Sequence, residues 1–311
     1  MKPYPFLRIA LLLLAVLLVA ACQRTTRPDT TAALPTGDLR AALAGDYDNH
    51  EQVWSAGTSA PPAVGFRVDA LPREGWLAWR TRLRATTTLE ATWLLRIDSV
   101  ADGNLVLTPH RPLVADAPLD KRFDAAQWVA LDACALRGTR SATGFAVAAD
   151  AGGCATIAPG IGVEAALLPL AIAHEGEWLR VRLFADQARG EGARAEARRV
   201  QWFSGWAAVN GAGDKATMDS ADWHMNKDLR IGNEGGRAAI HWRDGKPSGW
   251  SLQLERLTYR DGSTPVLKLS LVEDAGGHAV AYAWANPEAS SIGLNLGWVQ
   301  VGLSRDTAAK P

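Results

Sequence analysis

Short runs in which apolar and polar positions alternate dominate this chain, and they predict a mainly β protein built from antiparallel strands. In the first half, strand-like runs cover residues 64–70, 76–84, 89–97, 105–107, 134–139, 144–149, 167–173 and 177–184. Asp102-Gly103-Asn104 carries residues typical of a tight hairpin turn. We expect these strands to form one antiparallel domain over residues 38–185.

The second half, from Val200 onwards, carries an equally regular strand pattern. Seven short runs recur at a spacing of about ten residues, which predicts an antiparallel sandwich or barrel. They cover residues 200–209, 223–231, 237–243, 250–255, 267–271, 280–284 and 292–298. We expect a β-rich domain over residues 200–303, either a second small barrel or an extension of the first sheet.

The segments between and around these strands lack strand alternation. Residues 38–53 predict an N-terminal helix, because Leu39, Leu43 and Tyr47 fall at helical spacing, and Gly45 is expected to break or bend it. Residues 186–199 are charged and rich in glycine, which predicts a linker or a short exposed helix. Residues 304–311 are expected to form a disordered tail.

The N-terminus has the composition of an export signal, which we place at residues 1–22. Lys2 and Arg8 precede an uninterrupted apolar run from position 9 to position 21, too short to span a bilayer. The run ends in Val19-Ala20-Ala21-Cys22, which resembles the lipobox of bacterial lipoproteins. That resemblance implies that Cys22 becomes the first residue of the mature chain and carries a diacylglyceryl thioether and an N-acyl chain such as palmitate.

A lipidated Cys22 predicts the location of the protein. Several acyl chains anchor a protein firmly, whereas one chain is marginal. Gln23 stands where lipoproteins of the inner membrane often carry Asp, so we expect an outer-membrane anchor facing the periplasm. Residues 23–37 are rich in Thr, Arg, Pro, Ala and Gly and predict a flexible tether.

Two cysteines remain, Cys134 and Cys154, twenty positions apart. In an oxidising compartment such a pair is expected to form a structural disulfide. The alternative is a redox or metal-binding role, but neither cysteine belongs to a Cys-x-x-Cys motif and no His lies at ligand spacing.

The first domain also carries a motif around Gly45-Asp46-Tyr47-Asp48-Asn49-His50-Glu51-Gln52. Its Gly-aromatic-x-Asn-x-x-Gln pattern, followed by Cys134, Gly144-Phe145 and Cys154, resembles the CpcT/CpeT family of phycobiliprotein chromophore lyases over about residues 38–185. The resemblance implies a lipocalin-like β-barrel that holds an open-chain tetrapyrrole and attaches it to a cysteine of an acceptor protein. The ligand-binding residues that we expect are Tyr47, Asn49, Gln52, Arg80, Arg82 and Arg96.

Two further interpretations stay open beside this lyase hypothesis. The chain could be a non-enzymatic, periplasm-facing lipoprotein that binds a hydrophobic ligand, or a structural lipoprotein whose barrels are filled. A cavity flanked by arginines and carboxylates favours a ligand, whereas barrels packed by Trp and Leu favour the structural role. The equal numbers of basic and acidic residues, 33 of each, argue against a nucleic-acid partner.

Other polar residues provide weaker signals. Asp46, Asp48, His50 and Glu51 could supply an acid that protonates a bound bilin, or could form a solvated helix end. His224 and His241 lack a His partner at ligand spacing, so we expect solvated strand residues and no metal. The sequence contains no nucleophile elbow, P-loop or dinucleotide fingerprint.

Overall fold

The computed structural model describes residues 36–84, 87–99, 103–114, 117–184, 192–217, 219–259 and 264–307. The expected signal peptide, Cys22, most of the expected tether and residues 308–311 of the expected tail lie outside this part of the chain. Within the described ranges, no helix has the length and the apolar composition needed to cross a membrane.

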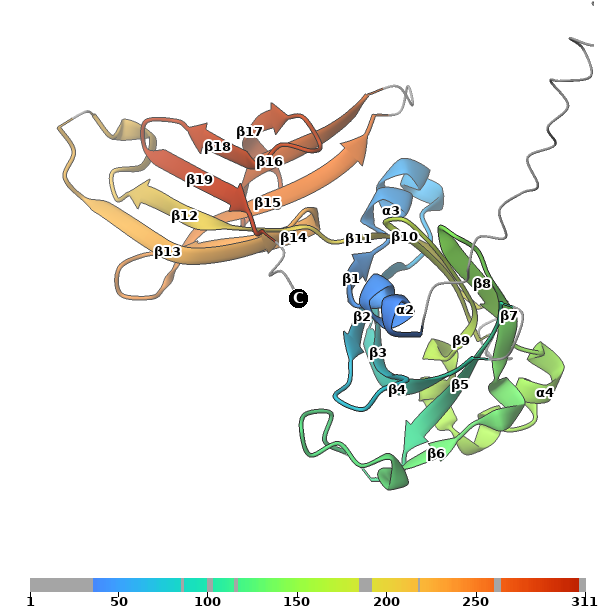
Figure 1. Cartoon of the computed structure of the whole chain (residues 1–311). Coiled ribbons are helices and arrows are strands. Elements are labelled where there is room, and N and C mark those ends of the chain that lie inside the picture. Colours follow the sequence, from blue (N-terminus) through green and yellow to red (C-terminus); the bar gives the residue numbers. More distant parts are fainter. Residues whose placement is uncertain are drawn as a thin grey trace, which may run out of the picture. The chain divides into compact units, whose positions relative to one another are not determined.

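The first half of the chain forms a closed antiparallel β-barrel of ten strands, as Figure 1 shows. In order around the ring these are β4 (Thr88–Ser99), β3 (Trp76–Arg84), β2 (Ala63–Ala70), β1 (Gly45–Asp48), β11 (Arg194–Arg199), β10 (Trp178–Leu183), β9 (Pro169–Glu175), β8 (Gly144–Ala148), β7 (Leu136–Arg140) and β5 (Asn104–Pro112). Pairing of β4 with β5 closes the ring. The short strand β6 (Trp128–Ala130) pairs with the end of β5.

Apolar side chains fill the interior of this barrel. Trp79 and Trp93 are almost fully buried, together with Phe66 and Leu95, because alternate positions of each strand point inward. The indole Nε1 of Trp93 donates a hydrogen bond to the carbonyl oxygen of Leu167 at 3.2 Å. The interior is therefore a packed core.

The predicted helix over residues 38–53 is wrong in its middle. The structure has two helices, α2 (Thr36–Leu43) and α3 (His50–Ala56), separated by strand β1. Gly45 has φ +148°, a conformation that favours glycine, and it starts the strand. Leu39 and Leu43 of α2 belong to the barrel core, so their helical spacing was interpreted correctly.

The remaining helical pieces are short. They are α4 (Ala151–Ala155) and the 3₁₀ turns η1 (Gly57–Ser59), η2 (Ala125–Gln127), η3 (Asp132–Cys134), η4 (Ala158–Gly160), η5 (Gly162–Leu167) and η6 (Gly213–Lys215).

The second half forms two four-stranded antiparallel sheets (Figure 1). One sheet has the order β13 (Trp223–Gly232), β12 (Trp202–Asn210), β19 (Val299–Arg305), β18 (Ser291–Asn295), and the other has the order β14 (Glu234–His241), β15 (Pro247–Thr258), β16 (Pro265–Glu273), β17 (Ala279–Ala285). One apolar cluster contains Phe203 and Val301 from the first sheet and Leu254 and Leu269 from the second. Because the two sheets share this core, they form a sandwich.

Four predicted boundaries differ from the structure. Residues 194–199, expected in a linker, form β11, because Ala195 and Ala197 point into the barrel between charged neighbours. The run 292–298 contains β18 and the turn at Gly297, and β19 starts at residue 299. Residues 304 and 305 belong to β19 and not to a disordered tail. The strand expected over 237–243 is β14, which starts three residues earlier and ends at residue 241.

Cys134 and Cys154 form a disulfide. Both cysteines are fully buried, one at the end of η3 and the other in α4, so the predicted strand beginning at Cys134 starts two residues later, at Leu136. The bond closes a loop with a sequence separation of 20, for which the loss of chain entropy in the unfolded state is worth about 3 kcal/mol.

Candidate functional site

A groove of about 810 Å³ lies along the outer surface of strands β1 to β4 and reaches residues of β13 and β14. We call it the arginine groove, because six arginines line it: Arg67, Arg80, Arg82, Arg84, Arg230 and Arg237. Asp46, Asp48 and Glu90 are the carboxylates of its lining, and Glu234 borders the groove with a fully buried side chain. The groove therefore presents more positive than negative side chains.

The alternation of β3 explains why its arginines line this groove and do not enter the barrel. Trp79 and Thr81 are fully buried and face the core, which directs Arg80 and Arg82 to the outside. Arg80 and Arg82 therefore do not point into the barrel and cannot bind a ligand in its interior.

Each groove arginine already has a carboxylate partner within the protein. Arg80 pairs with Asp69 and Arg82 pairs with Glu90. Arg67 pairs with Asp69 at 3.2 Å, Arg84 with Asp48 at 2.7 Å, Arg230 with Asp306 at 2.9 Å and Arg237 with Asp274 at 3.4 Å. These arginine side chains are 39–60% exposed, so solvent screens the pairs.

One aromatic side chain completes the groove. The guanidinium carbon of Arg230 lies 4.3 Å from the centre of the Trp202 ring, and Trp202 Nε1 donates to Asp46 at 3.0 Å. The lining residues include no serine and no cysteine within the described part of the chain. The groove is thus suited to bind a flat anion and offers no serine or cysteine nucleophile.

Three predicted ligand-binding residues of the motif form hydrogen bonds within the fold, and one of them, Tyr47, also lines the groove. The Tyr47 ring is buried in the barrel, its hydroxyl donates to the Leu43 carbonyl at 3.0 Å, and burial raises its pKa to about 12. Asn49 Oδ1 accepts from the Val64 amide at 2.7 Å, and Gln52 Oε1 accepts from the Glu196 amide at 3.0 Å.

The three predicted arginines divide between two places. Arg80 and Arg82 line the groove, whereas Arg96 is not among its lining residues and pairs with Asp98 at 3.1 Å. The alternation within β3 and β4 could have placed all three on the outer surface. Arg230 and Arg237 were missed, because only the sandwich brings them to the groove.

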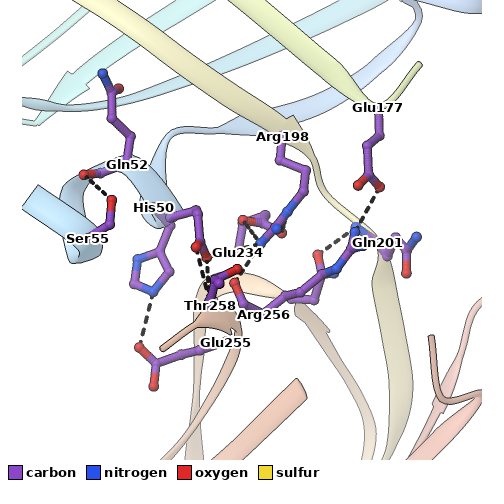
Figure 2. Close-up of polar contacts among 12 residues, drawn as sticks. His50, Gln52, Ser55, Glu177, Arg198, Gln201, Glu234, Glu255, Arg256 and Thr258 are labelled. Carbon is purple, nitrogen blue, oxygen red and sulfur yellow. Dashed lines mark hydrogen bonds and ion pairs between the residues drawn. The ribbon is translucent and has the colours of Figure 1, made fainter. Parts of the chain in front are cut away.

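A buried group of charged residues borders the groove, and Figure 2 shows polar contacts among its members. We call it the ion cluster; it comprises His50, Glu51, Arg198, Glu234, Glu255 and Arg256. Its centre is a two-point ion pair, in which Arg198 Nε lies 2.8 Å from Glu234 Oε1 and Arg198 Nη2 lies 3.0 Å from Glu234 Oε2. The Glu234 side chain is fully buried and that of Arg198 is 5% exposed.

The ion cluster ties α3 and β11 to strands β14 and β15. His50 Nε2 lies 3.1 Å from Glu255, and Glu51 accepts from the Thr258 amide at 3.0 Å. Arg256 pairs with Glu177 at 2.8 Å. The alternative of a solvated helix end is therefore wrong for His50 and Glu51, because both side chains bind residues of the second half.

Two effects oppose each other at Glu234. Burial favours the neutral acid and raises the pKa from 4.5 to about 7, although the bond to Arg198 favours the carboxylate. Because its side chain is fully buried, Glu234 cannot touch a molecule in the groove, and we assign it a structural role.

This raised pKa predicts a pH-dependent stability. The folded protein binds a proton at Glu234 more tightly than the unfolded chain does. The resulting stabilisation of the folded state is fully present below pH 4.5 and is lost as the pH rises through about 7. We expect the free energy of unfolding to fall by about 3 kcal/mol from this group. Urea unfolding at pH 5 and pH 8 measures it, and Glu234→Gln should remove the difference. A variant with the wild-type pH slope would contradict the assignment.

Comparisons with protein-family models, with curated proteins and with solved structures find no match to this chain. Among the described residues, no group of three or more His, Cys, Asp or Glu side chains is placed to hold a metal ion.

Proposed function

We propose that this protein is a lipid-anchored binding protein of the bacterial cell envelope and that it holds a flat organic dianion in the arginine groove. The observation that carries the proposal is the convergence of arginines from β2, β3, β13 and β14 on one groove, beside the ring of Trp202. Arginine binds carboxylates through two parallel hydrogen bonds, and its guanidinium plane also stacks on flat conjugated groups.

The internal ion pairs of the groove are compatible with such a ligand. An exposed pair contributes only about 0–1 kcal/mol, because water and salt screen it. Arg80 and Arg82 are 39% and 59% exposed and can exchange Asp69 and Glu90 for ligand carboxylates at small cost. The internal carboxylates keep the empty groove from accumulating repulsive charge.

An open-chain tetrapyrrole, the ligand implied by the resemblance to the CpcT/CpeT family, has the chemistry that this groove would take. It has a flat conjugated body and two propionate groups. In a lipocalin-like site the ligand would lie inside the barrel. We propose the outer groove instead, because Trp79 and Trp93 occupy the interior.

Titration with biliverdin tests this proposal. The mature chain with Cys22→Ser should give a saturable change in ligand absorbance and quench the tryptophan fluorescence. The double variant Arg80→Gln/Arg82→Gln should bind at least about 100-fold more weakly, since each of the two lost charge-assisted hydrogen bonds is worth about 1.5–3 kcal/mol. Biliverdin dimethyl ester, which lacks both charges, should bind the wild-type protein as weakly as the double variant binds biliverdin.

Arg96→Gln is the matched control, because Arg96 is an equally exposed, ion-paired arginine of β4 that does not line the groove. It should bind biliverdin like the wild type. Equal affinities of the wild type, the double variant and the ester would refute binding in the groove. Cell fractionation of the wild type and Cys22→Ser tests the anchor, and only the wild type should stay with the outer membrane after a high-salt wash, which releases protein held by its surface charges.

Attachment of the chromophore to an acceptor cysteine is a second proposal, which depends on this binding. Asp48 favours it, because burial raises the pKa of this groove carboxyl although Arg84 opposes the shift. A carboxyl with a raised pKa keeps its proton to higher pH than an ordinary Asp, and such a group is suited to protonate a bound bilin while a thiol adds to the bilin double bond. Biliverdin is used only to measure binding, whereas a bilin with a reactive exocyclic double bond and added N-acetylcysteine tests transfer. A thioether adduct formed by the wild type and lost in Asp48→Asn is expected, and no adduct would exclude the lyase.

A further inference from the structure

A second hollow lies on the outer surface of the barrel strands β7 to β11, with a volume of about 570 Å³. Alanines form its floor: Ala146 and Ala148 of β8 with Ala171 and Ala173 of β9. Arginines stand around it: Arg137 of β7, Arg180 and Arg182 of β10 and Arg194 of β11. We call this hollow the alanine trough. It is separate from the arginine groove, with which it shares no lining residue.

Two of these arginines face each other across neighbouring strands. Arg182 of β10 stands directly opposite Arg194 of β11, and in the other direction it pairs with Ala171. The same row continues through Ala148 to Arg137. Like charges directly opposite each other destabilise a sheet, so an anion bound between Arg182 and Arg194 would stabilise this arrangement.

The same barrel shows how it compensates such pairs elsewhere. Arg67 and Arg80 are also directly opposite each other, and Asp69 binds both guanidinium groups. Arg180, the neighbour of Arg182 in the trough, stands opposite Glu196 and lies 3.8 Å from it. In contrast, no carboxylate of the described residues forms an ion pair with Arg137, Arg182 or Arg194.

We propose that Arg182 and Arg194 bind an anion and that this anion is the phosphate of an amphiphile. Its phosphate would bridge Arg182 and Arg194, and its apolar body would lie on the alanine floor towards Arg137. A phosphate offers more oxygen atoms than a carboxylate and can bind two guanidinium groups at once. The alanine side chains present only methyl groups and no hydrogen-bonding atoms, which suits an apolar body.

A phospholipid of a bilayer is the source to which we commit. If Cys22 is anchored, residues 23–35 limit the distance between the bilayer and the start of α2 to about 45 Å, because an extended chain spans about 3.5 Å per residue. The formal net charge of the chain is zero, so general attraction to an anionic surface is weak and a local site must supply the affinity. This inference depends on the anchor of the proposed function but not on the arginine groove.

Co-sedimentation with vesicles tests the trough in the mature chain with Cys22→Ser, which binds only through its surface. We expect binding to phosphatidylglycerol vesicles and at least tenfold weaker binding of the variant Arg182→Gln/Arg194→Gln. The control variant Arg96→Gln/Arg122→Gln removes the same charge from two exposed arginines outside the trough and should bind like the wild type. Thermal unfolding of all variants checks that each one is folded.

Two outcomes would overturn the proposal. Equal vesicle binding by the wild type and the trough variant would show that Arg182 and Arg194 do not hold the headgroup. Binding of soluble glycerol phosphate without any binding to vesicles would assign the trough to a small phosphate ester and reject the bilayer as its source. The biliverdin titration is independent of both outcomes, because the trough variant leaves the arginine groove intact.

Discussion

Replacement of Arg198 by alanine is expected to lower the free energy of unfolding by about 3–5 kcal/mol at pH 8, where Glu234 is ionised. The Arg198 side chain is 5% exposed and that of Glu234 is fully buried, so water cannot solvate the carboxylate once its partner is removed. Equilibrium unfolding in urea measures the change. At pH 5 the loss should be smaller, because Glu234 can then take up a proton.

Two further variants separate the ion pair from a general effect of losing an arginine. Arg180→Ala removes an arginine whose side chain is 49% exposed and should change the stability by less than about 1 kcal/mol. The double variant Arg198→Met/Glu234→Leu replaces both charges by apolar groups and should recover most of the loss. A loss for Arg198→Ala that matches Arg180→Ala would show that the pair is solvated.

The ion cluster also explains why the two halves of the chain need each other. Arg198 ends β11 of the barrel, whereas Glu234 starts β14 of the sandwich. If only one half were folded, each of these charges would lose its partner. We therefore expect the charges of this cluster to specify one arrangement of α3 and β11 against β14 and β15.

Alternation along the chain predicted most of the barrel, because inward positions carry large apolar residues. In β3 and β9 this signal is strong, and the predicted and observed strands overlap along most of their length. The prediction from alternation failed at β1. Tyr47 lies at helical spacing from Leu39 and Leu43, but it reaches the barrel core from a strand. Local periodicity cannot distinguish a continuous helix from a helix followed by a strand when a glycine turns the chain between the two elements.

The candidate sites were harder to predict, because they depend on partners that are distant in sequence. The sequence of β3 left the direction of Arg80 and Arg82 open, because one Trp lies on each face of this strand. The groove exists only once Arg230 and Arg237 reach it. Similarly, the sequence of β11 resembles a linker, and the segment becomes a strand because it pairs with β1 and β10 in the barrel. The inward positions of β11 are alanines, which give only a weak hydrophobic signal. The role of its arginines depends on the residues of β10 that lie opposite them.

Replacement of Trp93 by alanine is expected to lower the free energy of unfolding by about 3–5 kcal/mol, because it removes a side chain that is 1% exposed in the barrel core. It also removes the donor to the Leu167 carbonyl. Trp93→Phe, which keeps an aromatic ring but loses this hydrogen bond, should cost less. Urea unfolding at pH 7 measures both variants.

The same variants decide where a ligand binds. If the barrel interior is a packed core, Trp93→Phe should bind biliverdin like the wild type, because the arginine groove lies on the other surface of the strands. A barrel that holds its ligand inside would give the opposite pattern. Its affinity for biliverdin would change several-fold in Trp93→Phe, and Trp93→Ala would bind the ligand in the enlarged space and be stabilised by it. That pattern, together with unaltered binding by Arg80→Gln/Arg82→Gln, would move the site from the groove into the barrel.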